Sequence, residues 1–193
     1  MIYGRDFGLP FDQINGQMPW GVNTADGVID VVVILDGVAT TPEQLDVAPV
    51  SPAIFTFEFG GGPAIVQNFK FEDNDVIDGS FAQAPGAIPG LVTQAAPVGG
   101  AIIIFANGLG EVDAPITDGE AGLRNVIGNV RVFIDGVEVQ IIGNAVLHQT
   151  LVALNQVNAF VPGVEPGDQK SLQIEVNGVL SRPDVFIAVR PAP

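Results

Sequence analysis

Carboxylates are the residues of this chain with the clearest potential for chemistry. Four of them, Glu72, Asp73, Asp75 and Asp78, fall close together and are followed by Gly79. Alternate acidic side chains on a turn can gather several hard oxygen atoms, which is the donor set that Ca²⁺ requires. The spacing lacks the Gly and the final Glu of an EF-hand loop. The cluster is therefore a candidate Ca²⁺ site, with a solvated turn as the alternative.

A second acidic cluster, Glu111, Asp113, Asp118 and Glu120, is divided by Pro115. A glycosidase needs two carboxylates that face each other across a cleft, and nothing in this spacing indicates such a pair. The cluster is a weaker cation candidate than the first.

His148 is the only histidine, and no G-x-S-x-G nucleophile pattern occurs anywhere in the chain. A serine hydrolase needs a nucleophile oriented by an imidazole, so we expect His148 to be solvated or to cap a loop. Most zinc geometries are excluded because there is one His and no Cys. The sequence thus predicts no enzyme and no cofactor other than the Ca²⁺ left open above.

Aromatic side chains near the amino terminus are the candidate ligand contacts. Tyr3 and Trp20 lie there, with Phe7 and Phe11 between them. A flat aromatic face can stack on carbohydrate, although packing in a core is the alternative explanation. Tyr3 and Trp20 are therefore the candidate carbohydrate-stacking residues.

The charge balance excludes two classes of partner. The chain has 22 acidic and 7 basic residues, a formal net charge of −15. A polyanion repels phosphate backbones and anionic membranes, so we expect no nucleic-acid partner. The longest apolar run, Ala101–Ala106, is too short to cross a bilayer, so we expect no membrane insertion.

Short apolar runs joined by Gly and Pro predict an all-β fold. Apolar strands flank Asp36-Gly37, Asp135-Gly136 and Asn177-Gly178, the pattern of two-residue type I′ hairpins. Residues 85–193 contain about seven such strands, the count and size of an immunoglobulin-like sandwich.

One strand–turn–strand unit occurs twice. The stretch Gln13–Pro19 recurs as Gln156–Pro162, and each copy continues into an apolar strand, Val31–Leu35 or Leu172–Val176, followed by an Asp/Asn-Gly turn. An internal repeat favours two units. We therefore expect a tandem of immunoglobulin-like β-sandwiches.

The two predicted units are unequal. Residues 1–84 form an incomplete unit that contains an irregular insert at 53–84, and residues 85–193 form the complete sandwich. The first unit lacks leading strands that the second has, which leaves backbone groups and half a core to be covered by something.

Several segments resemble a known family. They are Gln13–Trp20, Pro52–Thr56 (with Ala53 where the family has Gly), Asn107–Gly119 and Gln156–Pro162. In these the chain resembles the uncharacterised carboxy-terminal domain that recurs in large secreted proteins of Solibacter and related acidobacteria. The resemblance implies an extracellular immunoglobulin-like tandem with no assigned activity. The family normally has several strands before the Gln-Ile-Asn stretch, and this sequence departs from it there.

Two functions follow as hypotheses. The first is a non-catalytic extracellular or cell-surface module, structural or adhesive, that self-associates by intermolecular β-strand complementation, with a filament as one form. Its candidate donor strands are Met1–Phe11 and Ala84–Gln94, and coverage by the second unit of the same chain is the alternative. The second hypothesis is a carbohydrate-binding accessory module of a secreted protein. Met1–Arg5 shows no signal-peptide pattern, so we expect a trimmed chain or another export signal.

Overall fold

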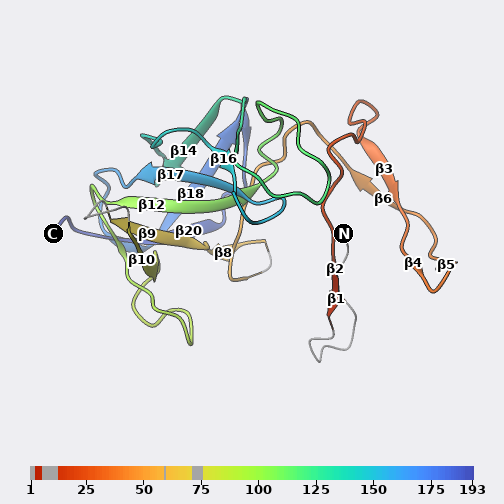
Figure 1. Ribbon diagram of the computed structural model, residues 1–193. Helices are drawn as coiled ribbons and strands as arrows, with labels where there is room; N and C mark the ends of the chain where they lie inside the picture. Colours follow the sequence, from red (N-terminus) through yellow and green to blue (C-terminus); the bar gives the residue numbers. More distant parts are fainter. Residues whose placement is uncertain (1–2, 6–12, 59, 71–75) are drawn as a thin grey trace.

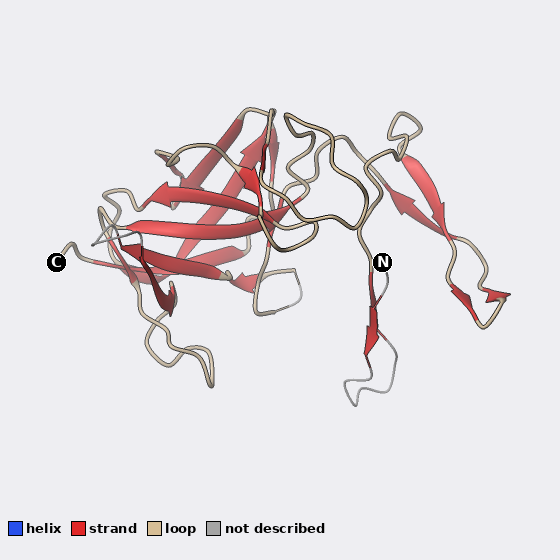
Figure 2. Cartoon of the chain, in the orientation of Figure 1, coloured by secondary structure: helices blue, strands red, loops and turns tan. Residues whose placement is uncertain are grey.

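The computed structural model describes residues 3–5, 13–58, 60–70 and 76–193 (Figure 1). All the regular secondary structure among these residues is β-strand, and Figure 2 shows the strands joined by loops and turns. Runs rich in Val, Ile and Phe favour the pleated surface of a sheet, and Gly and Pro interrupt them too often for helices. The all-β prediction is confirmed.

Most strands belong to two seven-stranded sheets, which form a sandwich. The first sheet contains β7 (Ala53–Ile54), β9 (Val66–Lys70), β10 (Val76–Phe81), β12 (Ala101–Asn107), β13 (Arg124–Asn125), β16 (Val146–Leu147) and β17 (Asn155–Phe160). The second contains β8 (Gly62–Pro63), β11 (Ala96–Pro97), β14 (Val130–Ile134), β15 (Val137–Val139), β18 (Gly167–Val176), β19 (Val179–Leu180) and β20 (Val185–Arg190).

The core lies between these sheets. Ile102 and Ile104 from β12 and Val157 from β17 are fully buried, as are Ile174 from β18 and Ile187 from β20. Along β18 the residues from Leu172 to Val176 alternate between buried and half-buried, as a strand with one face on the core requires. The apolar alternation in the sequence therefore marks the inner face of this sheet correctly.

The three predicted hairpin turns are confirmed. Their φ angles are +50° and +80° at Asp36-Gly37, +52° and +77° at Asp135-Gly136, and +51° and +88° at Asn177-Gly178. A type I′ turn needs positive φ at both central residues, which Gly adopts freely and which Asp and Asn tolerate better than most residues.

The described residues of 53–84, which the sequence predicts as an irregular insert of the first unit, belong to the sandwich instead. In this segment β9 pairs with β12, placing Val66 opposite Ile104, while β7 also pairs with β12 and β8 pairs with β20. The boundary predicted between residues 84 and 85 therefore falls inside the sheets. Strand pairing is a long-range contact, and the spacing of apolar residues along the chain does not encode it.

Strand order within the sandwich is partly that of an immunoglobulin domain. The orders β20-β18-β14-β15 and β12-β17-β16 correspond to the two sheets of that architecture. However, β7, β8, β9 and β10 lie outside the pattern. Residues 85–193 also carry ten strands rather than about seven, four of them only two residues long. The sandwich is observed, and its immunoglobulin-like assignment stays a prediction.

Residues 21–48, called the arm from here on, project from one side of the sandwich (Figure 1). The arm is a long ribbon in which β3 (Val28–Val31) pairs with β6 (Glu43–Asp46) and β4 (Ile34–Leu35) pairs with β5 (Val38–Ala39). A separate hairpin of β1 (Tyr3–Arg5) and β2 (Gln13–Asn15) precedes it. None of these strands pairs with either sheet of the sandwich among the residues described.

Candidate functional site

The chain enters and leaves the arm through two short segments, residues 16–20 and 49–52, called the stems. The first stem is fastened to the loop after β12. Gly119 donates its backbone N–H to Oε1 of Gln17 at 2.8 Å, and Trp20 donates its own to Oδ1 of Asp118 at 2.7 Å. An N–H bonded to a carboxylate makes a charge-assisted hydrogen bond. The base of the arm is thus bonded to the sandwich.

The second stem lies against the end of β12. Ser51 donates its backbone N–H to the carbonyl of Gly108 at 2.9 Å. Gly108 has φ +70°, and a Cβ built on it would lie 2.0 Å from the carbonyl oxygen of Ser51. Gly110, at φ +89°, would bring a Cβ to 2.7 Å from Cγ1 of Val50. Glycine is therefore required at both positions, because no side chain fits between the stem and the strand.

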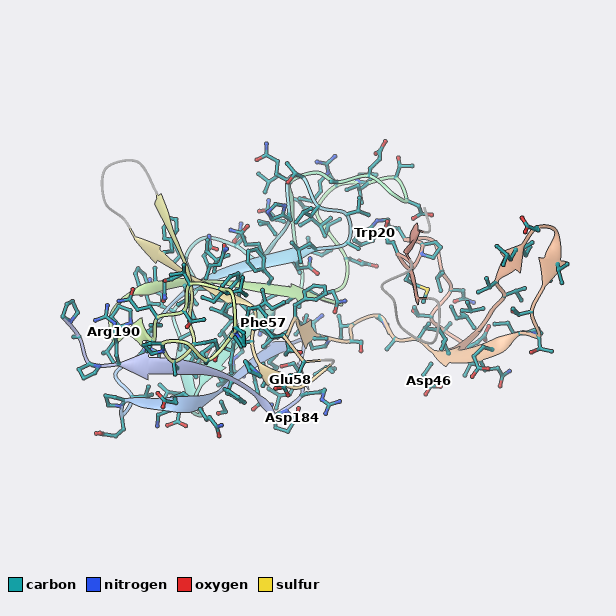
Figure 3. The ribbon with its side chains drawn as sticks, turned by 90° about the horizontal axis from the view of Figure 1, so that it is seen from below. Trp20, Asp46, Phe57, Glu58, Asp184 and Arg190 are labelled. Atoms are coloured by element: carbon teal, nitrogen blue, oxygen red, sulfur yellow. The ribbon has the colours of Figure 1, made fainter. Side chains whose placement is uncertain are left out.

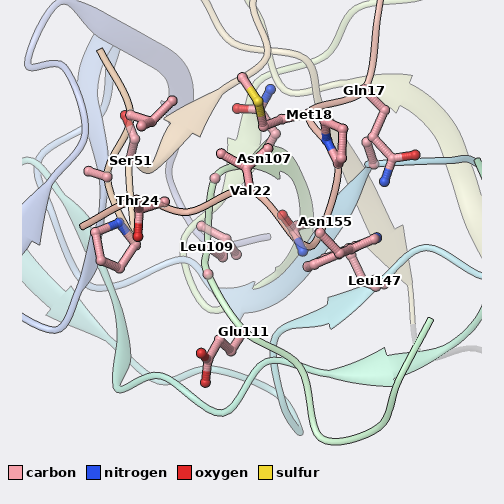
Figure 4. A pocket seen from close by; sticks show the side chains of 18 of the residues that line it. Gln17, Met18, Val22, Thr24, Ser51, Asn107, Leu109, Glu111, Leu147 and Asn155 are labelled. Carbon is pink, nitrogen blue, oxygen red and sulfur yellow. The ribbon is translucent and has the colours of Figure 1, made fainter. Parts of the chain in front are cut away.

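A cavity of about 550 Å³ lies between the stems and the sandwich (Figure 4). Its apolar lining includes Met18, Val22 and Leu109, and its polar lining includes Asn107, Glu111 and Asn155. A concave space lined by both apolar and polar groups is a candidate small-molecule site. We call this space the root cavity.

Trp20, the first predicted carbohydrate contact, lines the root cavity with 38% of its surface exposed. In Figure 3 it lies beside the arm that carries Asp46, away from Phe57 and Arg190 of the sandwich. The alternative of packing in the sandwich core is wrong for Trp20. Tyr3, the second predicted contact, belongs to β1, but its side chain is outside the described part of the chain.

The predicted Ca²⁺ site falls largely outside the described residues. Glu72, Asp73 and Asp75 are not described, and Asp78 belongs to β10 without a described side chain. Within the described ranges no three acidic or histidine side chains are gathered closely enough to hold a metal ion. The Ca²⁺ site stays a prediction.

The residues of the second acidic cluster have different roles in the structure. Asp113 accepts a hydrogen bond from the side chain of Asn125 at 2.6 Å and another from its backbone N–H at 3.0 Å. The side-chain bond from Asn125 is the main reason that the pKa of Asp113 lies below its usual value. Asp118 holds the first stem, and Glu111 lines the root cavity. Asp113 and Asp118 therefore serve hydrogen bonding within the fold.

His148 caps the loop that follows β16, as the sequence predicts. Its Nδ1 accepts hydrogen bonds from the backbone N–H groups of Thr150 and Leu151, each at 3.2 Å. Its ring lies 6.4 Å from that of Phe105, measured between centroids. This imidazole nitrogen is occupied by backbone groups of its own loop.

The arm carries a group of exposed apolar side chains. Leu35 and Val38 are each 72% exposed and Ile34 is 69% exposed, and Val28, Val32 and Leu45 are exposed as well. Single exposed apolar residues are ordinary, but a group on one element marks an interaction surface. Both faces of the Val31–Leu35 strand are apolar in the sequence, yet the sandwich of the same chain leaves Val32, Ile34 and Leu35 exposed. Coverage by the second unit of the same chain is therefore not what the structure shows.

The arm repeats the local geometry of β18 and β19. Thr40 donates its N–H to the carbonyl of Val33 at 2.9 Å, and its Oγ1 accepts from the N–H of Val33 at 3.2 Å. Ser181 makes the same two bonds with Ile174, at 2.8 and 3.0 Å. Each hydroxyl thus closes the ribbon beyond its Asp/Asn-Gly turn. The internal repeat seen in the sequence is a repeat of structure here.

The two copies differ in burial. Leu172, Ile174 and Val176 are fully buried under the facing sheet. Counting back from the turn, their counterparts in the arm are Val31, Val33 and Leu35. Val31 and Val33 are half-buried, and Leu35 is 72% exposed. The arm has the side chains of a core strand without a core over them.

No protein-family model, curated protein or solved structure matches this chain. The resemblance to the acidobacterial secreted domain therefore stays a prediction. A search of the described residues for a helix of sufficient length and apolarity to span a membrane finds none. Function has to be inferred from the surfaces of the chain, because a sandwich fold serves many functions.

Proposed function

We propose that this chain is a non-catalytic structural or adhesive module of the bacterial exterior that self-associates through its arm. The observation that carries the proposal is the exposure of Leu35, whose counterpart Val176 is buried in the sandwich, together with the exposure of Ile34 and Val38 beside it. A two-stranded ribbon alone is marginally stable in water. Its unpaired backbone edges are templates for pairing with another strand, which is the chemistry of strand complementation.

The charge distribution is compatible with contact restricted to the arm. With a formal net charge of −15 the molecules repel one another over most of their surface, which keeps them soluble. Only an apolar surface with unpaired backbone groups then offers a net gain on contact. The resemblance to secreted acidobacterial domains supports an extracellular location for this assembly.

Sedimentation velocity of the intact protein over a wide concentration range tests the proposal. We expect the unaltered chain to form larger species as its concentration rises. The double variant Leu35→Lys, Val38→Lys should remain monomeric, because each ammonium group would have to be desolvated in the contact. Ile127→Lys is the matched control, since Ile127 is 60% exposed on a loop of the sandwich and lies outside the arm and both candidate donor segments. Monodisperse monomers of the unaltered chain at every concentration would contradict the proposal.

A carbohydrate-binding module is the second candidate, and the position of Trp20 in the root cavity favours it. Neutral oligosaccharides are the suitable probes, because the acidic chain would repel anionic ones. Trp20 is the only tryptophan, so its fluorescence reports on this cavity alone. Calorimetry should show binding that Trp20→Phe retains and Trp20→Ala loses. No heat and no fluorescence change with any neutral oligosaccharide would remove this candidate.

A further inference from the structure

The internal repeat identifies which edge of the arm lacks a strand. In the arm Ile29 is opposite Leu45, and in the sandwich its counterpart Lys170 is opposite Ile187. The pairing of β3 with β6 therefore corresponds to the pairing of β18 with β20. On its other edge β18 also pairs with β14, with Ile174 opposite Val132. The corresponding edge of β3 and β4 has no partner among the described residues.

Both faces of this strand are apolar, which restricts what can pair with it. Successive side chains point to opposite faces, so Val31 and Val33 share one face while Val32 and Ile34 share the other. Only Asp30 interrupts the apolar series from Val28 to Leu35. A partner strand that fits must itself be extended and apolar on both faces, because each side chain packs against the one opposite.

The sandwich of a second copy offers no edge of this kind among the described strands. At the ends of its sheets, β15 has three residues, and β11 and β13 have two each. The pairing of β10 with β9 is irregular, and the N–H of Phe81 is already bonded to the carbonyl of Val92. Val92 belongs to the segment 84–94, a predicted donor. This segment is itself held against β10, because Gln94 also donates its N–H to the carbonyl of Phe81 at 2.9 Å. Short and interrupted edges of this sort resist pairing between molecules.

We propose that the free edge of β3 and β4 is occupied by the same edge of the arm of a second copy. The two arms run antiparallel about a two-fold axis and form one four-stranded sheet, in the order β6-β3-β3-β6. Each side of such a contact uses the same residues, which is the rule for a two-fold interface. The pairing converts a marginal ribbon into a sheet of more than three strands with a continuous apolar face. This inference rests on the proposed self-association and specifies its geometry.

The charge of the arm gives the contact a diagnostic response to salt. The arm carries five acidic residues and no basic one: Asp26, Asp30, Asp36, Glu43 and Asp46. Two arms side by side therefore repel each other through these carboxylates. Added salt screens charges beyond about 10 Å at 0.1 M ionic strength. Association of arm with arm should consequently strengthen with NaCl, whereas association with a basic surface would weaken.

Disulfide cross-linking of the intact chain tests the geometry, because the chain contains no cysteine of its own. Single variants at every position from Val28→Cys to Ile34→Cys place one thiol at each successive point along the strand, on alternate faces. A disulfide needs Cβ atoms about 3.5–4.5 Å apart. In an antiparallel two-fold pairing only the position nearest the axis is opposite its own copy. One of these positions should therefore cross-link most rapidly, with rates falling on both sides.

Val92→Cys on the sandwich is the control for random collision. We expect a maximum of cross-linking rate at one of the arm positions, well above the control. We also expect sedimentation to shift toward larger species as NaCl rises. The protein could self-associate while the arm variants cross-link no faster than Val92→Cys, or its oligomers could dissociate as NaCl rises. Either result would show that the arm-to-arm pairing is wrong and would leave the proposed self-association intact. If the protein is monomeric throughout, both proposals fail.

Discussion

The repeat allows one perturbation to be made twice, in a buried and in an exposed setting. Val176 and Leu35 occupy corresponding positions before their turns, and they are 0% and 72% exposed. The substitutions Val176→Ala and Leu35→Ala therefore remove apolar groups from the same local geometry. We expect the first to destabilise the fold and the second to leave the dilute protein unchanged.

The magnitudes follow from burial. Val176→Ala removes two methyl groups, each worth about 0.8 kcal/mol when buried. The cavity left behind adds to this, for a total of about 2 kcal/mol. For a protein of this size that loss lowers the melting temperature by about 4–8 °C. Leu35→Ala alters a largely solvated side chain, and such substitutions stay within about 0.5 kcal/mol.

Calorimetry at low and high protein concentration is the assay. In dilute solution the melting temperature should fall for Val176→Ala and stay within about 2 °C of the unaltered chain for Leu35→Ala. At high concentration the melting temperature of Leu35→Ala should fall below that of the unaltered chain, because association stabilises only a chain whose arm can pair. A large loss for Leu35→Ala in dilute solution would mean that its own chain buries this side chain. That result would refute the account of the arm.

Three further outcomes are expected. Gly108→Ala should lower the melting temperature far more than Gly143→Ala. Both glycines have positive φ, but only at Gly108 would a Cβ collide with a neighbouring backbone. Equal losses would show that the positive φ alone sets the cost. Hydrogen bonds from Arg131 hold the pKa of Glu138 below its usual value of 4.5, so this pair stabilises the fold above that pH and its contribution is lost as the pH falls through the lower folded value. Arg131→Met should flatten this part of a urea-midpoint profile against pH. Calorimetric titration with Ca²⁺ should give heat if the loop 72–78 binds the ion. A titration without heat would remove the predicted Ca²⁺ site.

The hairpins and the all-β class are determined by local sequence. The turns Asp36-Gly37, Asp135-Gly136 and Asn177-Gly178 are predictable because the cost of positive φ depends on the residue itself and not on its neighbours in space. Alternation of apolar side chains from Leu172 to Val176 likewise assigns the inner face of β18 without knowledge of the facing sheet. The repeat of this unit is also readable from sequence, since it is a likeness between two stretches of the same chain.

Strand partners depend on tertiary structure alone. Nothing in the residues from Ala53 to Lys70 indicates that β9 lies beside β12, because many apolar strands would satisfy the same pattern. The root cavity cannot be predicted from the sequence either. It forms where distant segments meet, as shown by the hydrogen bond from the backbone of Trp20 to an aspartate 98 positions away. The exposure of the arm is decided in the same way. Val31–Leu35 has the composition of a core strand, and whether it has a core depends on which surfaces reach it, a property of the folded chain and its partners.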